Sequence, residues 1–428
     1  MKTKLKKYYP YPIYLIMTIA FSFMYYYFPK VQDDIFNSKS QELHSWRWML
    51  DTNASMYSTW SDRIIINPWM FICTNDLPKW LYSIITAIIT MIIIYFLSRK
   101  LIKHPYLWTA SILAALTFPA IQLSTAGYIA TTVTYIYPVS LICLSVMILE
   151  TNKWYLKIIT IPLLLFSFNN EQLCICAGVF LIYYIIRYYK KWRIYLYPLI
   201  PWIIDLAIAI HSPGNHSRTL NDTHEWLPKF AHFTFFDKVN VGMITTIQHY
   251  LFGLTLPIIL LSLFLLIKHY HEHKILAWVP LTIVFATNCV TFFATQPDHW
   301  ATTPNPTMNN IAIVTYLIGF IWLLATLYLL NNLDYIVLLL AGLAARCMLG
   351  FSPTIYISST RTFMFCDLIM IYLTVQIIVK TKWQQPLTPI MILLMAAFLN
   401  AVINYTIITQ WNVIKYTLPP IQYWYITK

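Results

Sequence analysis

The sequence predicts an all-α, polytopic membrane protein, and three observations support this fold class. Of the 428 residues, 59% are hydrophobic and only 11% are charged, whereas soluble domains carry about 25% charged residues. Apolar stretches of roughly 17–25 residues, the length that a spanning helix needs, recur along the whole chain. Basic residues gather in the short connections between these stretches, as expected for cytoplasmic loops. We therefore expect one transmembrane domain over 1–428, without a separate soluble domain.

The composition also argues against several other classes of protein. The net charge of +13 needs no nucleic-acid partner, because Lys and Arg in cytoplasmic loops anchor spanning helices. The chain has only eight glycines, and none belongs to a G-x-G-x-x-G or G-x-x-x-x-G-K-S/T motif that binds nucleotides. The seven cysteines lie mostly in apolar segments without Cys-x-x-Cys spacing, which argues against a disulfide framework and a zinc site. No cofactor and no metal are expected.

About thirteen spanning helices are predicted from the apolar stretches. The first should remain in the membrane, since the basic stretch Met1–Lys7 precedes an apolar run that lacks a cleavage site of small residues. The basic loops put the amino terminus in the cytoplasm and the carboxyl terminus outside. The predicted spans lie near 11–28, 80–98, 107–124, 132–149, 155–168, 172–187, 193–211, 244–267, 275–295, 310–330, 334–351, 362–379 and 387–409.

In this topology, the long and polar connections all fall on the external side of the membrane. They include 29–79, 211–243 and 352–361, whereas the predicted internal loops are short and basic. Within 29–79, the stretch Gln41–Leu50 carries two indole rings on an amphipathic pattern. Such a helix lies in the membrane interface rather than crossing it. The sequence therefore predicts that the protein carries out its chemistry on the external face.

The first candidate site is the adjacent pair Asp33 and Asp34, just after the first predicted span. The chain has only 16 acidic residues, so two side by side at a membrane edge are unusual. Neighbouring carboxylates repel, and one of the two is then expected to titrate late and to accept a proton. Both are candidate catalytic residues, and the sequence leaves open which is the base. The alternative interpretation is a solvated flank that ends the first span.

The second candidate is the short external turn that contains Asn169, Glu171 and Gln172. A turn of this length needs few polar residues, and an ionisable group at bilayer depth is costly unless it faces a cavity. These three side chains are therefore predicted to bind substrate.

Two further external segments each supply an arginine. A predicted helix ends near Pro213 and is followed by Asn215 and Arg218, and the 352–361 loop ends with Arg361. The planar guanidinium of arginine suits phosphate oxygens. The alternatives are an ordinary turn for the first segment and a helix anchor for Arg361. We predict substrate-binding roles for Asn215, Arg218 and Arg361.

Chemistry on an external face without a nucleotide site requires a donor that the membrane carries, and lipid-linked phosphosugars are donors of this kind. Transfer of the sugar then needs a base near the bilayer surface that deprotonates an acceptor hydroxyl. It also needs cations that hold the leaving phosphate. Asp33 or Asp34 together with Arg218 and Arg361 would provide both.

On these motifs the chain resembles the GT-C superfamily of membrane glycosyltransferases, in particular bacterial multi-pass members of unassigned substrate. The resemblance implies that the acidic pair supplies the catalytic carboxylate and that the donor is a polyprenyl-phosphate sugar. It also implies a glycan or lipid-linked acceptor and a bacterial plasma membrane. Acceptor recognition is expected in 29–79 and 211–243, because no large soluble domain follows the spans. The matching positions are Asp33-Asp34, then Gly127 with Tyr135, Tyr137 and Pro138, then Asn169 with Glu171 and Gln172, then Pro213-Gly214-Asn215 with Arg218, and Ser352-Pro353 with Arg361.

Two other functions stay open at this point. A transporter or flippase of lipid-linked saccharides would use the same polar residues to line a path. Such transporters show inverted repeats and charges near the membrane midplane, whereas the polar residues here concentrate at one face, which favours the enzyme. A polymerase or ligase of surface polysaccharide shares both the external location and the lipid-linked substrates.

Overall fold

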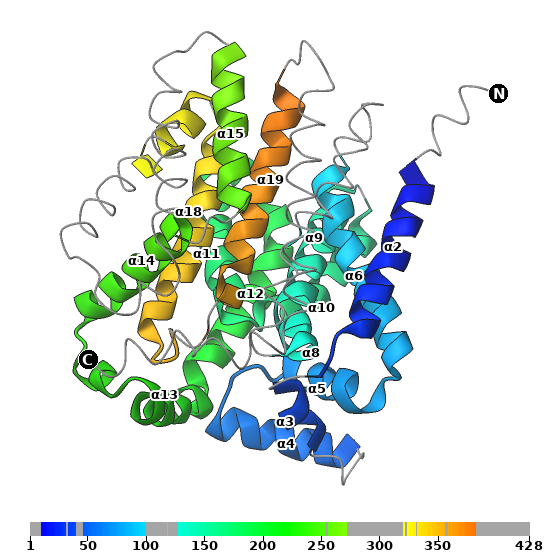
Figure 1. Ribbon diagram of the computed structural model, residues 1–428, viewed down its shortest axis with the longest axis vertical. Coiled ribbons are helices and arrows are strands. Elements are labelled where there is room, and N and C mark those ends of the chain that lie inside the picture. Colours follow the sequence, from blue (N-terminus) through cyan, green and yellow to red (C-terminus); the bar gives the residue numbers. More distant parts are fainter. Residues whose placement is uncertain are drawn as a thin grey trace. The chain divides into compact units, whose positions relative to one another are not determined.

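The computed structural model describes residues 10–30, 33–39, 46–99, 118, 127–151, 153–252, 256–271, 320–321, 323–330, 332–355, 358 and 360–381. Within these ranges the regular elements are helices and no strand occurs (Figure 1), so the all-α prediction is confirmed. The chain divides into two compact units. The first comprises Met1–Ala115, Pro119–His224 and Ser358–Phe365, and the second comprises Leu116–Phe118, Glu225–Ile357 and Cys366–Lys428.

The helices of the first unit follow the predicted apolar segments closely, with short helices and irregular turns between them. The longer ones are α2 (Pro10–Tyr27), α4 (Trp46–Thr59), α6 (Lys79–Ser98), α9 (Tyr137–Leu149), α10 (Trp154–Phe168), α11 (Glu171–Arg187), α12 (Trp192–His211) and α13 (Pro213–Trp226). The shorter ones are α3 (Asp33–Lys39), α5 (Ile66–Phe71), α8 (Tyr128–Thr131), the π-helical turns η1 (Ile72–Asp76) and η3 (Thr132–Ile136), and the 3₁₀ turns η4 (Tyr189–Lys191) and η8 (Thr360–Phe363).

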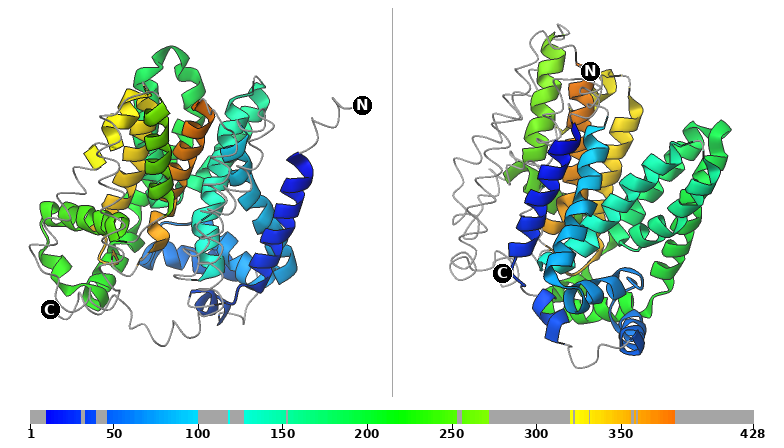
Figure 2. Two further views of the ribbon diagram at one scale, coloured as in Figure 1. Left: turned by 45° about the horizontal axis from the view of Figure 1, so that its top comes forward. Right: turned by 90° about the vertical axis from the view of Figure 1, so that its right-hand side faces the viewer.

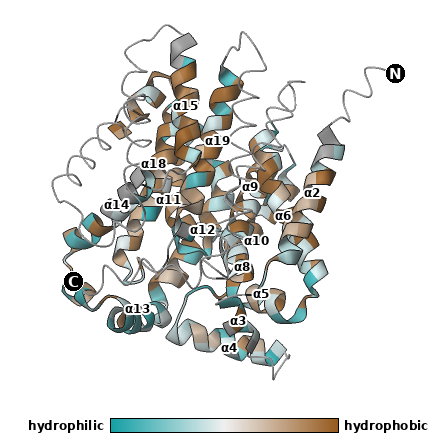
Figure 3. Ribbon diagram, viewed as in Figure 1, coloured by the Kyte–Doolittle hydropathy of each residue, from teal (hydrophilic) through white to brown (hydrophobic). Residues whose placement is uncertain are grey.

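The second unit contains the helices that follow residue 225. They are η5 (Pro228–His232), α14 (Phe235–Phe252), α15 (Leu256–His271), α18 (Leu333–Cys347), η7 (Met348–Phe351) and most of α19 (Met364–Lys380). Inside this unit the hydroxyl of Tyr250 on α14 donates a hydrogen bond of 3.1 Å to Asp367 on α19. In Figure 3, α15 and α19 are mostly hydrophobic, whereas α13 is mostly hydrophilic.

Among the residues that the structure describes, five helical stretches are long and apolar enough to cross a membrane, which is compatible with a membrane protein. Predicted spans near 107–124 (except Phe118), 275–295 and 387–409, with much of 310–330, lie outside the described residues. The number thirteen therefore stays a prediction. The five stretches are Lys79–Ser98, Tyr128–Leu149, Arg193–His211, Leu333–Phe351 and Arg361–Lys380, and shorter apolar helices cover Tyr14–Tyr27, Trp154–Phe168 and Leu256–Lys268.

The structure differs from the sequence prediction in 211–243, which was expected to be a loop and is largely helical. Helix α14 begins at Phe235, well before the expected start at 244. Its start is a reciprocal cap between Thr234 and Asp237. The Thr234 amide donates to the Asp237 carboxylate at 2.9 Å, and the Asp237 amide donates to the Thr234 hydroxyl at 3.2 Å. Such a capping box satisfies amide groups that a helix start leaves unpaired. Proline at the first position similarly favours the start of α13.

The predicted interfacial helix over 41–50 corresponds to α4, which begins at Trp46 among the described residues and continues to Thr59. Trp46 and Leu50 are exposed on α4, whereas Met49 is buried. The position of this amphipathic helix at a bilayer surface stays a prediction.

Within the first unit, polar contacts hold neighbouring apolar helices together. Helix α2 lies alongside α6 (Figure 2), and the hydroxyl groups of Tyr25 and Thr90 are 2.9 Å apart in the buried interface. At the end of α6, both amino groups of Arg99 donate to the carboxylate of Glu150 at 2.7 Å. Helices α10, α11 and α12 also lie side by side, as Figure 2 shows.

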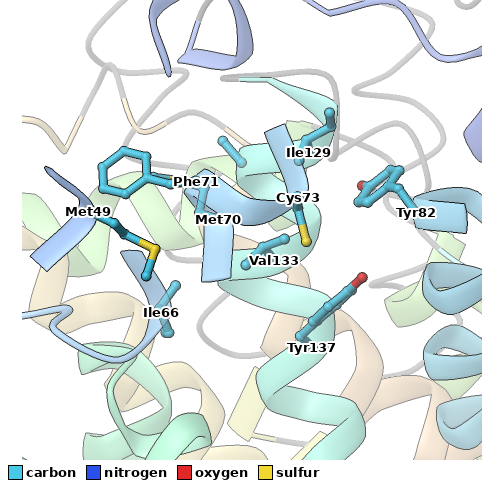
Figure 4. Close-up of a cluster of buried hydrophobic side chains, with 10 residues drawn as sticks. Met49, Ile66, Met70, Phe71, Cys73, Tyr82, Ile129, Val133 and Tyr137 are labelled. Carbon is cyan, nitrogen blue, oxygen red and sulfur yellow. The ribbon is translucent and has the colours of Figure 1, made fainter. Parts of the chain in front are cut away.

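A cluster of buried side chains joins α4, α5, η1, α6, α8, η3 and α9 (Figure 4). Aliphatic, aromatic and sulfur-containing side chains interdigitate in it, so the short helices after α2 are packed against the long ones. Burial of one such side chain stabilises the fold by roughly 1.5–3 kcal/mol. The cluster contains Met49, Ile66, Met70, Phe71, Cys73, Tyr82, Ile129, Ala130, Val133 and Tyr137.

Candidate active site

Asp34 joins α3 to the beginning of α8. Its carboxylate accepts hydrogen bonds from the backbone amides of Ala130 at 2.8 Å and Ile129 at 3.2 Å, and the residue is 0% exposed. Amides at a helix start lack partners within the helix, so a carboxylate there is favourable. Gly127 precedes α8 with φ +142°, and a Cβ atom on it would lie 2.7 Å from Asp34 Oδ1. Asp34 is therefore held by backbone groups in the interior.

Asp33, the neighbouring residue, is exposed. Within the described part of the chain its carboxylate has no hydrogen-bond or ion-pair partner. Protein atoms around it raise the pKa of the Asp33 carboxyl by desolvation, and the charges of Arg361, Arg218 and Arg63 lower that pKa by a smaller amount. The net effect is a raised pKa, as expected for a carboxylate that can accept a proton.

Residues 169–172, which form the turn after α10 and the first two positions of α11, connect the segments that carry these arginines and are called the 169–172 turn. The side-chain oxygen of Asn169 accepts hydrogen bonds from the backbone amides of Ile65 at 2.9 Å and Ile66 at 3.2 Å. Its amide nitrogen donates to the Asp62 carbonyl at 3.1 Å and to the Asp205 carboxylate at 3.4 Å. Asn169 thus fixes the 62–66 segment against the turn.

Two other side chains of the 169–172 turn reach different segments. Asn170 donates to the carbonyl of Thr134 at 3.1 Å. Thr134 lies in η3, and the wider spacing of π-helical hydrogen bonds is frequent at functional sites. Gln172 donates to the carbonyl of Thr362 at 3.3 Å. Because Thr362 follows Arg361, this bond holds the short η8 turn that carries the arginine.

Glu171 forms an ion pair with Arg63. The Nε and Nη2 atoms of Arg63 donate to one Glu171 oxygen at 3.2 and 2.9 Å. Burial alone would raise the pKa of the Glu171 carboxyl, but the charge and hydrogen bonds of Arg63, together with the charge of Arg218, outweigh burial and lower that pKa. For Asp62 the balance is opposite, because burial and then the charge of Glu171 raise its pKa to about 7. Near neutral pH, Glu171 is therefore ionised, whereas the neighbouring Asp62 carboxyl is partly protonated.

Arg218 is held by a carboxylate and an aromatic ring. Its Nε atom donates to Asp222 at 3.1 Å, and its guanidinium lies 5.3 Å from the centre of the Trp60 ring. The start of α13 packs closely on the chain before Trp60, since a Cβ atom on Gly214 would lie 2.6 Å from the Tyr57 carbonyl. A side chain at position 214 would therefore push α13 away from this segment.

The sequence-predicted residues separate into two groups in the structure. Asp33, Arg218 and Arg361 interact electrostatically. In the second group, Glu171 contacts an arginine, and the remaining predicted residues bind backbone groups, with Asn169 also donating to the Asp205 carboxylate. Asn215, for example, donates to the carbonyl of Ala209 at 3.2 Å, which supports the end of α12.

Arg361 is half-buried and, among the residues that the structure describes, has no ion-pair or hydrogen-bond partner.

Sequence reasoning missed Asp62, Arg63 and Asp205. The signal for the first two was the polar run Ser61-Asp62-Arg63 between two apolar segments. Asp205 was hidden because it lies within a predicted span, where it is only 2% exposed. The described residues contain no group of three or more His, Cys, Asp or Glu side chains that could hold a metal ion.

Searches against protein-family models, curated proteins and solved structures found no match to this chain. The residues of the site themselves define its chemistry. It combines one exposed carboxylate of raised pKa with the charges of three guanidinium groups. This combination can accept a proton from one substrate and hold an anion of another.

Proposed function

We propose that the protein is a membrane glycosyltransferase that transfers a sugar from a polyprenyl-phosphate donor to a hydroxyl group of a glycan or lipid-linked acceptor. The observation that carries this proposal is the placement of Asp33. It is exposed, lacks a hydrogen-bond partner within the described chain, and is influenced by the charges of Arg361, Arg218 and Arg63. A proton acceptor beside cations is the pair of functions that such a transfer requires.

In this mechanism Asp33 is the base. Its carboxylate accepts the proton of the acceptor hydroxyl while the hydroxyl oxygen attacks the anomeric carbon of the donor sugar. The bond between that carbon and the phosphate oxygen breaks, and the electron pair leaves with the polyprenyl phosphate. The phosphate changes from a diester with one negative charge to a monoester with up to two. Cations beside it therefore stabilise the transition state more than the ground state.

Asp34 has a supporting role in this proposal. Its carboxylate is occupied by two backbone amides and is buried, so it does not reach an acceptor. It positions α3 and thereby the exposed Asp33 in the first turn of the same helix. The choice between the two neighbouring carboxylates thus favours Asp33 as the base.

The proposed setting is the external face of a multi-pass cell membrane, with the amino terminus in the cytoplasm. Five helices of spanning length and composition are compatible with a membrane location. The positive-inside distribution of the basic residues supports the orientation. The resemblance of the motifs to bacterial GT-C glycosyltransferases supports a bacterial plasma membrane and a substrate of the cell envelope.

A transporter or flippase of lipid-linked saccharides is the second candidate, and one observation favours it. Asp205 lies within α12, a helix that is apolar and long enough to span a membrane, yet it is 2% exposed. Ionisable residues inside spanning helices often mark a substrate or proton path. The enzyme remains favoured, because Asn169 binds Asp205 within the same polar region as the arginine segments.

The experiment is transfer of a labelled sugar from a polyprenyl-phosphate donor by the purified protein in nanodiscs. Asp33→Asn should retain the fold and lower the rate by about 10²–10⁴-fold, the usual contribution of a general base. Glu150→Gln is the control, because Glu150 is an exposed carboxylate at the end of α9, outside the site and outside the 29–79 segment. Full transfer activity of Asp33→Asn would show that Asp33 is not the base. Movement of the lipid-linked sugar across the bilayer of liposomes, without transfer of the sugar to an acceptor, would support the transporter.

A further inference from the structure

Arg63 uses only part of its guanidinium in the ion pair with Glu171. The Nε and Nη2 atoms bind one carboxylate oxygen, whereas Nη1 has no hydrogen-bond partner among the described residues. The Arg63 side chain is 24% exposed. A guanidinium has five N–H donors in a fixed plane, so the pair with Glu171 leaves donors of Arg63 available.

The 169–172 turn connects Arg63 to the other parts of the proposed site. Glu171 holds Arg63 at 2.9 Å, and the neighbouring Gln172 holds the turn beside Arg361 through a bond of 3.3 Å. Asn170 binds η3, which directly follows the helix that Asp34 caps. A small number of hydrogen bonds thus connects Arg63, Arg361 and the helix of Asp33.

The charges of the three arginines are balanced to different degrees. Arg63 is paired with Glu171, and Arg218 is paired with Asp222. Arg361 forms no salt bridge in the described ranges, and Asp33, the carboxylate whose pKa its charge lowers, becomes neutral when it accepts the acceptor proton. One uncompensated cation balances the single negative charge of a phosphodiester. The charge that the phosphate gains on leaving needs a second cation whose donors are accessible.

We propose that Arg63 is a further substrate-binding residue, which binds the phosphate of the lipid donor as its second charge develops, and that Glu171 is a positioning residue that aligns it. This inference rests on the proposed function. A guanidinium held along one edge by a carboxylate is oriented before the reaction, and its remaining donors form charge-assisted bonds with phosphate oxygens. Glu171, which was predicted to bind substrate, instead acts on the substrate through Arg63.

The competing explanation is an ion pair that only stabilises the fold. The two explanations differ in the charge state of the ligand that Arg63 recognises. Farnesyl phosphate is a monoester like the leaving group, whereas its methyl diester carries one charge like the donor. Loss of a fold-stabilising pair would affect both ligands equally.

The experiment measures binding of these two probes to the full-length protein in nanodiscs. Arg63→Gln should weaken the binding of farnesyl phosphate about tenfold, the effect of 1.4 kcal/mol, and should weaken the binding of the methyl diester much less. Arg361→Gln should weaken both probes. Glu171→Gln keeps the charge of Arg63 but not its alignment, so the preference for the monoester should fall. The matched control is Arg99→Gln, which breaks the carboxylate pair with Glu150 at the end of α6.

Equal weakening of both probes by Arg63→Gln, or no weakening, would overturn the inference while leaving the proposed function intact. If Arg63→Gln does not fold, Arg63→Lys provides the test. Lysine keeps the positive charge but lacks the planar set of guanidinium donors, so the preference for farnesyl phosphate over its methyl diester should fall several-fold. An unchanged preference would overturn the inference. Competition by inorganic phosphate as strong as that by farnesyl phosphate would identify a site for free anions. Failure of the unmodified protein to bind either probe or to transfer sugar would reject the proposed function itself.

Discussion

Asp34 occupies the space beside Gly127 that a side chain would need. The Cβ position of residue 127 lies 2.7 Å from Asp34 Oδ1, and Gly127 has φ +142°, which L-residues with a side chain rarely adopt. The two residues are far apart in the sequence, yet the glycine permits the carboxylate to cap α8. A substitution at either residue therefore affects how α3 is held.

We expect Gly127→Ala to destabilise the protein and to reduce transfer. Backbone strain of this kind costs about 1–3 kcal/mol, and the new methyl group would displace the Asp34 carboxylate. Thermal unfolding in detergent and the transfer rate are the measurements. Ala54→Ser on the exposed face of α4 is the control, because it adds one atom where no neighbour is displaced. An unfolding temperature equal to that of the unmodified protein would contradict the cap.

Asp33 and Asp34 should respond differently to the same substitution. Asp34→Asn replaces one of two acceptor oxygens by a donor facing a backbone amide, so it should lower the unfolding temperature. Asp33→Asn changes an exposed group without hydrogen-bond partners among the described residues, so it should change the unfolding temperature little and lower the transfer rate by about 10²–10⁴-fold. Measuring both properties for both variants tests the division of roles. Similar unfolding temperatures for the two variants would argue against it.

Stability should fall as the pH rises from about 4 to 7, because of Asp62. Its pKa is raised from 3.8 to about 7 by burial and by the charge of Glu171. In this range the folded protein keeps a proton that the unfolded chain releases, so the stabilisation is lost as the pH rises. The slope for one proton is about 1.4 kcal/mol per pH unit. Unfolding temperatures between pH 5 and 8 should show the decline, and Asp62→Asn should reduce it.

The ionisation of Glu171 changes the stability with pH in the opposite direction to that of Asp62, and over a lower pH range. Its lowered pKa contributes stability above the ordinary value of 4.5, and this contribution is lost as the pH falls through the lowered value. The two residues therefore affect separate parts of the pH profile. A profile of Asp62→Asn identical to that of the unmodified protein between pH 5 and 7 would show that Asp62 does not carry this proton.

Trp60→Ala should weaken donor binding through Arg218. The guanidinium lies 5.3 Å from the centre of the Trp60 ring, and such contacts contribute roughly 0.5–1 kcal/mol at exposed sites. We expect a donor KM that is a few-fold higher, while Trp60→Phe keeps an aromatic face and most of the effect. Steady-state kinetics with varied donor concentration give both values. Equal KM values for Trp60→Ala and the unmodified protein would show that the ring does not orient Arg218 for binding.

Cysteines introduced at positions 33, 171, 218 and 361 should all react with a membrane-impermeant thiol reagent added from outside. The positive-inside distribution predicts this common face. Labelling in intact cells, with lysed cells as the reference for total reactivity, measures it. Reaction of any of the four positions only after lysis would reverse the predicted topology at that segment.

The apolar segments could be predicted well from the sequence, because burial in a helix imposes a composition that is visible locally. The predicted 80–98 corresponds to Lys79–Ser98, and the predicted 155–168 to Trp154–Phe168. The helices within the predicted loop 211–243 were missed because their start signals are a proline and a capping box, whereas the prediction relied on hydrophobicity. The local signal Thr-x-x-Asp at Thr234 was present.

The site could be predicted only in part. Polar residues at predicted external ends identified Asp33 and Arg361, but Arg63 binds a partner 108 positions away in the sequence, and no local pattern encodes such a contact. The adjacent Asp33 and Asp34 could not be separated either. Neighbouring positions on a helix point about 100° apart, and only the packing against α8 decides which one is buried.

The π-helical turn η3 marks a point where the chain holds one residue more than a regular helix needs. A π-helical turn accommodates one residue more than an α-helical turn, and η3 lies between α8 and α9 in one continuous helical stretch, Tyr128–Leu149. Deleting a single residue from Thr132–Ile136 would let the stretch close into a regular α-helix while α8 and α9 keep nearly the same rotational phase. The amides of Ile129 and Ala130 would then still face Asp34, whereas the Thr134 carbonyl that Asn170 binds would be displaced. Loss of one residue in η3 should therefore disturb the contact with the 169–172 turn more than the cap formed by Asp34.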